Sequence, residues 1–314
     1  FISGEQISRD LHVSRTAIWK HINILKERGY IFESSTRKGY RLIYAPNLLT
    51  PLEIDSALHT ETFGRHVVYL SSTTSTNEEA KKIAREGAEE GTIVVAEEQT
   101  GGRGRLTRSF YCPFAKGIWF TLILRPKFFP MEASKCTLMA AVGVCRGIRR
   151  LGLQDAGIKW PNDILYHGKK LVGILTEMSA SMEKIDYIII GAGINTGMKK
   201  SEFPELFRES ATSFLAEGID VSRKDLLAAI LAELEKEYEI AQTQGFDKVL
   251  EDWKALSVTL GQDVRVIMGE ENYTGKAVDI DKDGCLLVDT GEKVERVIAG
   301  DVSIRPIDAP LPKR

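Results

Sequence analysis

Apolar residues near the N-terminal end recur at helical spacing in two short stretches. Ile7 and Leu11 lie one turn apart in GEQISRDL and mark the inner face of a first helix. Ile18, Ile22 and Leu25 recur on one face of a second helix and should pack inward. The pattern therefore predicts two short helices joined by a tight turn.

The residues around these helices favour the same interpretation. Ser14 is a good N-cap for the second helix, and Gly29 is a good residue to end it. YIFESS and YRLIY then alternate on either side of TRKG, which predicts a hairpin. Two helices followed by such a hairpin make a winged helix-turn-helix, which we assign to residues 1–45.

From residue 48 to residue 260 helices and strands are mixed, which predicts a central α/β domain. Thr50 and Pro51 open it as N-cap and first helical residue. The predicted strands are Val67–Leu70, Ile93–Ala96, GIWFTLILR, the hairpin ILYHGKKLVGIL and YIIIGAGIN, and the predicted helices are Asn77–Glu86, Ala133–Leu151, Arg223–Glu239 and Phe246–Ala255. Residues 261–314 contain short strands at close spacing, which predict a small β-barrel or sheet. The expected fold class is α+β.

Composition places the chain among ordinary globular proteins, with 43% hydrophobic and 27% charged residues. No apolar run approaches the roughly 20 residues of a membrane span, so we expect no membrane partner. The four cysteines and five histidines show neither disulfide nor metal-ligand spacing, which favours reduced thiols in a cytoplasm and no protein-built metal site. The chain opens at FISGEQ without a methionine, so we expect that some N-terminal residues are missing.

The net charge of −2 hides an asymmetry: residues 1–45 hold eight Lys/Arg and four Asp/Glu, a balance of +4, which leaves −6 for the rest. A basic module on an acidic body suggests nucleic-acid contact at one end. The candidate DNA-binding residues are Arg15, Thr16, Trp19, Lys20 and Asn23 on the second helix and Arg37 and Lys38 at the hairpin tip. The alternative is a helical hairpin with a solvated charged face, and the hairpin wing and the basic balance favour DNA.

The stretch QTGGRGRLTR, from Gln99 to Arg108, holds three arginines and three glycines. Such a segment has little to pack and costs much entropy to order. A ligand that supplied negative charge would order it, because arginines make charge-assisted contacts while glycine amides approach closely. We therefore expect an anion site, most simply for a phosphate, with the loop disordered when open and ordered when occupied.

Three further segments carry candidate chemistry, and each has a structural explanation as well. In STTSTN, Ser75 or Thr76 could serve only as an N-cap. In KWPND followed by KKLVGIL, Lys169 and Lys170 could be solvated charges at a hairpin turn. GAGIN could be a strand end that needs close backbone approach, since one GxG is a weak indication of phosphate binding.

In this order, STTSTN, QTGGRGR, KWPND with KKLVGIL, and GAGIN resemble the motifs of biotin–protein ligases. With a winged helix ahead, the chain resembles their bifunctional bacterial form, the biotin operon repressor, over essentially all 314 residues. The resemblance implies a class II synthetase-like central domain and an SH3-like C-terminal β-barrel. It has two departures: Thr107 stands where many relatives have glycine, which predicts a stiffer loop, and the chain starts inside the family's helix-turn-helix.

The resemblance also implies roles for individual residues. For biotin it implies contacts from Ser75, Thr76, Asn77, Gln99, Arg103, Gly104, Arg105 and Lys170, with Gly173 letting the backbone approach the ring. For the adenylate it implies Arg108, Asn162, Asn195 and Arg305. Lys170, Arg103 and Arg105 are the implied catalytic residues, because two anions must meet. Lys169 and Lys170 should point to opposite faces of their strand, and the match selects Lys170.

The implied reaction has two steps. The carboxylate of biotin attacks the α-phosphate of ATP and gives biotinyl-5′-AMP and pyrophosphate, with Mg²⁺ bound mainly through the nucleotide. A lysine amine of a biotin carboxyl carrier protein then takes the biotin, and AMP leaves. The intermediate would also promote a homodimer on operator DNA. The alternatives are a non-catalytic biotin-sensing transcription factor, which Lys170 and the arginine loop disfavour, and a lipoate–protein ligase, which the helix-turn-helix and the GRGR loop disfavour.

Overall fold

A computed structural model describes residues 1–27, 30–35, 37–44, 47–105, 109–268, 271–299 and 302–306, with the backbone alone at 271 and 302–306. The chain forms two compact units, Phe1–Leu48 and Leu49–Arg314. Within the described ranges, no helix combines the length and the apolar content that crossing a membrane requires.

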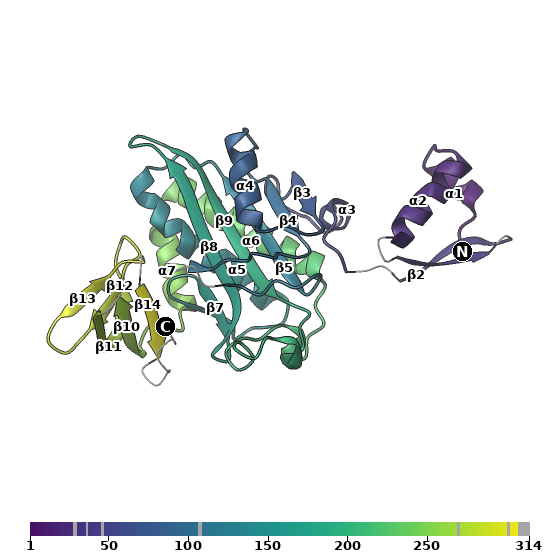
Figure 1. Ribbon diagram of the computed structural model, residues 1–314. Coiled ribbons are helices and arrows are strands. Elements are labelled where there is room, and N and C mark those ends of the chain that lie inside the picture. Colours follow the sequence, from purple (N-terminus) through teal and green to yellow (C-terminus); the bar gives the residue numbers. More distant parts are fainter. Residues whose placement is uncertain are drawn as a thin grey trace. The chain divides into compact units, whose positions relative to one another are not determined.

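The first unit is a helix pair followed by a hairpin, as predicted (Figure 1). Its elements are α1 (Gly4–Asp10), α2 (Arg15–Glu27), β1 (Ile31–Ser35) and β2 (Gly39–Tyr44). Ser14 caps α2, because its hydroxyl accepts the backbone N–H of Ala17 at 3.1 Å. Ile18 and Ile22 are the buried residues of α2.

Two details of this unit differ from the expectation. Leu11 is 63% exposed, so its assignment to the inner face is wrong: α1 ends at Asp10, and Leu11 lies past the last helical turn. Leu25 is only half-buried. The expected helix stop, Gly29, lies outside the described residues.

The N-terminal segment joins the hairpin of this unit. Ile2 exchanges two backbone hydrogen bonds with Tyr40, at 2.8 and 2.9 Å. Gly39 has a φ of +92°, and a Cβ there would lie 2.1 Å from the carbonyl oxygen of Ile2. Only glycine fits this position, because any side chain would strain the backbone and push Ile2 off the hairpin.

The second unit is built on a seven-stranded sheet of order β3-β4-β5-β9-β8-β7-β6, in which β3 and β4 are parallel and the other neighbours antiparallel. The strands are β3 (Val67–Leu70), β4 (Ile93–Ala96), β5 (Gly117–Leu124), β6 (Gly157–Lys159), β7 (Asp163–Tyr166), β8 (Lys169–Ala180) and β9 (Ile185–Asn195). The helices are α3 (Pro51–Asp55), α4 (Thr76–Arg85), α5 (Cys136–Arg150), α6 (Arg223–Gln244) and α7 (Asp247–Leu256), with 3-10 turns η2 (Pro130–Lys135), η3 (Lys200–Glu202) and η4 (Leu215–Glu217).

Helices cover the two faces of this sheet unequally (Figure 1). The main core joins one face to α5, α6 and α7 and includes Ile118 and Phe120 of β5. On the opposite face α4 packs Ala80 and Ala84 on Val94 and Ile123. The stretch expected as one helix over Ala133–Leu151 begins instead as η2, and α5 follows from Cys136.

The C-terminal strands form a five-stranded antiparallel sheet of order β13-β12-β11-β10-β14. They are β10 (Asp263–Met268), β11 (Glu271–Ile280), β12 (Leu286–Asp289), β13 (Val294–Val297) and β14 (Val302–Pro306). This sheet belongs to the same compact unit as the central one. The indole of Trp160 donates to the carbonyl of Gly284 at 3.1 Å, and Lys254 pairs with Asp279 at 2.8 Å.

A buried ion pair joins four distant parts of the second unit. Arg223, 2% exposed at the start of α6, lies 2.7 Å from the carboxylate of Glu97, which is fully buried. The same guanidinium donates to the carbonyl of Gly117, where β5 begins. The other oxygen of Glu97 accepts the N–H of Leu49 at 2.7 Å. One pair therefore fixes the start of the unit, the end of β4, the start of β5 and the start of α6.

We expect Arg223→Met to lower the free energy of unfolding by about 3–5 kcal/mol, because it leaves the Glu97 carboxylate buried and unpaired. Urea unfolding followed by tryptophan fluorescence measures it. Lys200→Met is the matched control, since the Lys200–Glu209 pair is 53% and 77% exposed and its loss should cost less than about 1 kcal/mol. Equal losses in the two variants would contradict a special role for the buried pair.

Candidate functional site

Strand register brings two rows of candidate residues onto one face of the central sheet. Asp163, Gly173, Gly193 and Trp119 pair in order across β7, β8, β9 and β5. The next row on the same face holds Leu175, Gly191 and Thr121. Side chains two residues apart point to the same face, so the rows lie about 7 Å apart.

The glycines of the first row leave room for an aromatic ring. A Cβ at Gly193 would lie 2.8 Å from Cε1 of Phe110, and one at Gly173 would lie 3.1 Å from its Cε2. The ring of Phe110 meets Trp119 edge-on, with centroids 5.9 Å apart. The two glycines thus form a flat floor that a planar group can cover.

Two cations are held beside this floor by neighbouring residues. The ammonium of Lys170 lies 2.7 Å from Asp163. The guanidinium of Arg105 donates to the side-chain oxygen of Asn162 at 3.3 Å. Asn162 is buried, and its amide nitrogen donates to the carbonyl of Ile174 at 2.6 Å. Cationic groups from two distant segments therefore meet at one dipeptide.

A register shift places Lys170 on this floor. Leu165 pairs with Lys170 while Ile164 pairs with Val172, so Leu171 is an additional residue in β8. A Cβ at Gly173 would therefore lie 3.1 Å from the ammonium of Lys170.

The first turn of α4 is capped from outside the helix. Ser75 occupies the N-cap position, but its hydroxyl makes no capping hydrogen bond. The side-chain oxygen of Gln99 accepts instead from the backbone N–H and the hydroxyl of Thr76, at 2.8 and 3.0 Å. A role for Ser75 as a helix cap alone is therefore not supported.

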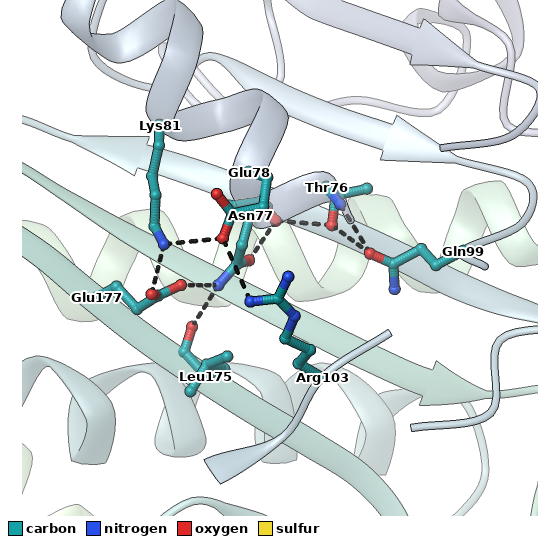
Figure 2. A network of polar contacts seen from close by, with 9 residues as sticks. Thr76, Asn77, Glu78, Lys81, Gln99, Arg103, Leu175 and Glu177 are labelled. Atoms are coloured by element: carbon teal, nitrogen blue, oxygen red, sulfur yellow. Dashed lines mark hydrogen bonds and ion pairs between the residues drawn. The ribbon is translucent and has the colours of Figure 1, made fainter. Parts of the chain in front are cut away.

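Asn77 connects α4 to the sheet (Figure 2). Its amide nitrogen donates to Glu177 at 2.8 Å and to the carbonyl of Leu175 at 3.4 Å. Lys81 binds the other oxygen of Glu177 at 2.6 Å and Glu78 at 3.1 Å (Figure 2). Burial opposes the charge of Lys81, but these two carboxylates raise its pKa on balance, so its ammonium stays charged.

The other expected ligand residues make fewer contacts with the residues around Lys170 and Asn77. Arg103 is 61% exposed, and its guanidinium lies 3.9 Å from Glu78. Gly104 is half-buried beside it. Asn195 donates to the carbonyl of Thr212 at 3.0 Å. Arg108 lies outside the described residues, and Arg305 is described only through its backbone, opposite Arg265 in the C-terminal sheet.

The expected DNA-binding residues lie mostly on the surface of the first unit. Those exposed are Arg15, Thr16, Trp19, Lys20, Arg37 and Lys38, whereas Asn23 is half-buried. Trp19, 57% exposed, is a large apolar ring held outward on α2.

Sequence reasoning missed Phe110, Thr121 and Glu177. Glu177 had a signal, because it follows Gly173 and Leu175 at the alternating spacing of one strand face and is charged within an apolar strand. Phe110 and Thr121 had none, since their place in the site depends on pairing between distant strands.

The thiol of Cys112 lies beside Gln99, whose amide nitrogen contacts its sulfur at 3.2 Å. Burial raises the pKa of Cys112 to about 12, so the thiol is protonated at neutral pH. In the described part of the chain no three His, Cys, Asp or Glu side chains gather where they could bind a metal.

The fold and site define a ligase of the biotin/lipoate type that follows a helix-turn-helix. The biotin/lipoate A/B protein ligase family matches residues 69–195, the biotin protein ligase C-terminal domain residues 259–305, and an HTH domain residues 1–41. The bifunctional ligase/repressor BirA of Bacillus subtilis (strain 168) is 41% identical over 305 residues, which are 97% of this chain and 94% of that protein. The chain belongs to the family of bifunctional biotin–protein ligase/repressors, so the predicted family and fold class are confirmed.

Two more comparisons support this assignment. BirA of Escherichia coli (strain K12) is 30% identical over 305 residues, covering 97% of this chain and 93% of that protein. The structure of the biotin protein ligase from Aquifex aeolicus in complex with biotin and ATP aligns with a TM-score of 0.68 at 28% identity. That alignment covers 77% of this chain and 99% of the other.

We expect Gly193→Ala to weaken biotin binding at least about tenfold, because the added methyl group would lie 2.8 Å from the ring of Phe110 and push that ring into the space that a ligand needs. Isothermal titration measures the affinity. Gly197→Ala is the matched control, since the nearest atoms to its Cβ lie 3.8 Å away in Lys116. A Gly193→Ala protein that binds biotin as tightly as the control would show that this floor is not the ligand surface.

Proposed function

We propose that this protein activates biotin with ATP and transfers it to a lysine of a biotin carboxyl carrier protein, and that its N-terminal unit represses transcription by binding operator DNA. One observation supports the enzymatic activity above all. Lys170 contacts Asp163 and Arg105 contacts Asn162, so both cations lie at the Asn162–Asp163 dipeptide, beside the glycine floor. A biotin whose ring system lay beside that floor would have the carboxylate at the end of its side chain within reach of the two cations.

The first step joins two anions. A carboxylate oxygen of biotin attacks the α-phosphorus of ATP, the bond from that phosphorus to the bridging oxygen breaks, and pyrophosphate leaves. Lys170 and Arg105 would lower the repulsion and stabilise the charge that develops on the phosphoryl oxygens. Lys170 is already held by Asp163 and Arg105 by Asn162, so neither has to be ordered at the moment of reaction.

The second step needs no further cation. The amine of the acceptor lysine attacks the carbonyl carbon of the biotinyl-adenylate, and AMP leaves with the electron pair of the broken C–O bond. Arg103, whose side chain is 61% exposed, would close over the intermediate and exclude water.

Magnesium belongs to the proposal only as a companion of the nucleotide. An Mg²⁺ ion would be held mainly by the phosphate oxygens of the nucleotide. Charge neutralisation by the protein therefore falls to its lysine and arginines.

We expect Lys170→Ala to lower biotin-dependent ATP–pyrophosphate exchange about a hundredfold or more, because the variant loses the fixed charge beside Asp163. Lys169→Ala, one residue earlier at the start of β8, should change it less than about threefold. Comparable losses in both variants would contradict the assignment of Lys170.

The exchange assay also separates the proposed activity from its two rivals. Exchange supported by biotin and not by lipoate is the expected result. Exchange supported by lipoate would indicate a lipoate–protein ligase. Biotin binding without any exchange would indicate a sensor that does not react.

The DNA-binding half is supported by the exposed residues of α2 and the basic tip of the hairpin. Arg15, Thr16 and Lys20 stand on the outer side of a capped helix, as recognition residues do. We propose that biotinyl-5′-AMP acts as corepressor by favouring a homodimer on a two-fold site.

The four cysteines are free and buried, which supports the proposed cytoplasmic location.

We expect truncation before Leu48 to abolish operator binding and to leave adenylate formation largely intact, since the unit boundary falls at Leu48.

Operator binding by the full chain should weaken steeply with salt, because phosphate contacts dominate affinity. It should strengthen when biotin and ATP are both present. Gel shifts at two salt concentrations, with and without both ligands, measure this, and binding that ignores the ligands would contradict the corepressor role.

A further inference from the structure

The two glycines of GAGIN, Gly191 and Gly193, lie on β9 and face the same side of the central sheet. Their surroundings differ. A Cβ at Gly193 would lie 2.8 Å from the ring of Phe110, whereas a Cβ at Gly191 would lie 2.0 Å from the amide oxygen of Asn77. The two glycines of one motif therefore make room for different side chains.

The strands on either side of Gly191 hold the two ends of the Asn77 carboxamide. Gly191 pairs with Leu175 of β8 and with Thr121 of β5. The amide nitrogen of Asn77 donates to the carbonyl of Leu175 at 3.4 Å and to Glu177, also on β8, at 2.8 Å (Figure 2). The amide oxygen accepts from the hydroxyl of Thr121 at 2.7 Å. The carboxamide therefore spans from β8 to β5 and lies across Gly191.

A side chain at position 191 would take the place of this carboxamide. Its Cβ would lie 2.0 Å from the oxygen, 2.8 Å from the carbon and 3.1 Å from the nitrogen of the amide group, all closer than van der Waals contact. Asn77 is only 6% exposed, so the group has little free space to move into. Lifting it off the sheet would also stretch the hydrogen bonds at both of its ends, because their partners belong to the flanking strands.

We propose that Gly191 is a positioning residue that seats the carboxamide of Asn77 on the sheet, so that Asn77 can contact biotin. Gly191 acts through Asn77 without touching the ligand. The inference rests on the proposed function for the contact between Asn77 and biotin. The rival explanation makes Gly191 a part of the ligand floor beside Gly193, and the two explanations differ in what happens once the Asn77 carboxamide is removed.

The measurement is the affinity for biotin, by isothermal titration of the full-length protein, together with Tm. We expect Asn77→Ala to weaken biotin binding roughly tenfold, as for one lost buried hydrogen bond. Gly191→Ala should weaken it at least as much, because the displaced carboxamide loses the same contact. It should also lower Tm by a few degrees, because the added methyl group overlaps the amide.

The decisive variant combines Gly191→Ala with Asn77→Ala. With the carboxamide gone, the methyl group at position 191 has space, so the double variant should bind biotin within about threefold of Asn77→Ala alone. Its Tm should lie above that of Gly191→Ala. Independent effects would instead multiply to a loss of roughly a hundredfold.

Gly193→Ala is the matched contrast, since it adds the same methyl group to the same face of the same strand. Its Cβ meets Phe110 and not Asn77, so its cost in biotin affinity should be the same with and without Asn77→Ala. If Gly191→Ala alone does not fold, a folded double variant that binds biotin like Asn77→Ala is still the expected result.

Four outcomes would overturn the proposal. They are full biotin affinity in Gly191→Ala, full affinity in Asn77→Ala, a further tenfold loss when Gly191→Ala is added to Asn77→Ala, and a double variant that is no more stable than Gly191→Ala. An unaltered protein that does not bind biotin would instead reject the proposed function itself.

Discussion

The buried ion pair between Arg223 and Glu97 is the constraint on which the second unit depends. Each charge would be costly to bury alone, and together they are satisfied by the carbonyl of Gly117 and the N–H of Leu49. Trp119 lies two residues beyond Gly117 on β5, so the row that holds the glycine floor takes its position from this pair. The geometry of the site therefore depends on two charges that are themselves buried in the core.

Three of the cations described at the site already lie beside acidic residues before any anion arrives. Lys170 is matched by Asp163, Lys81 by Glu177, and Arg103 stands near Glu78. An incoming carboxylate or phosphate would thus replace an acidic side chain as the partner of one of these cations. Such a site avoids holding bare charges on a partly buried face of the sheet, and it favours ligands that carry more than one negative group.

Local signals predicted most of the fold. Val67–Leu70 and Ile93–Ala96 are strands with the expected ends, and the hairpin turns at His167 and Gly168, whose φ values of 47° and 76° suit a tight turn. The site was predicted less completely, because its geometry depends on contacts between distant segments. No local sequence pattern predicts that Leu171 is an additional residue in β8, and this residue brings Lys170 beside Gly173.

Capping shows the same limit. A serine before a helix is read as its cap, yet here Gln99, far along the chain, accepts the N–H of Thr76. The amide nitrogen of Asn77 likewise donates to Glu177 and to the carbonyl of Leu175, which are 100 and 98 residues away in sequence. Sequence reasoning identified Gln99 as a motif residue but not its contact with α4, and it missed Glu177 altogether.

The position of Leu49 bears on how such proteins change their architecture over time. Leu49 is fully buried in the core of the second unit, and its N–H donates to Glu97. The packed core of that unit therefore includes its first residue. The Aquifex ligase aligns over 99% of its length with only 77% of this chain. A gene fusion or a deletion at this junction would leave the buried Leu49 and its hydrogen bond to Glu97 in place, so a lineage could acquire or discard the N-terminal unit without redesigning the core of the enzyme.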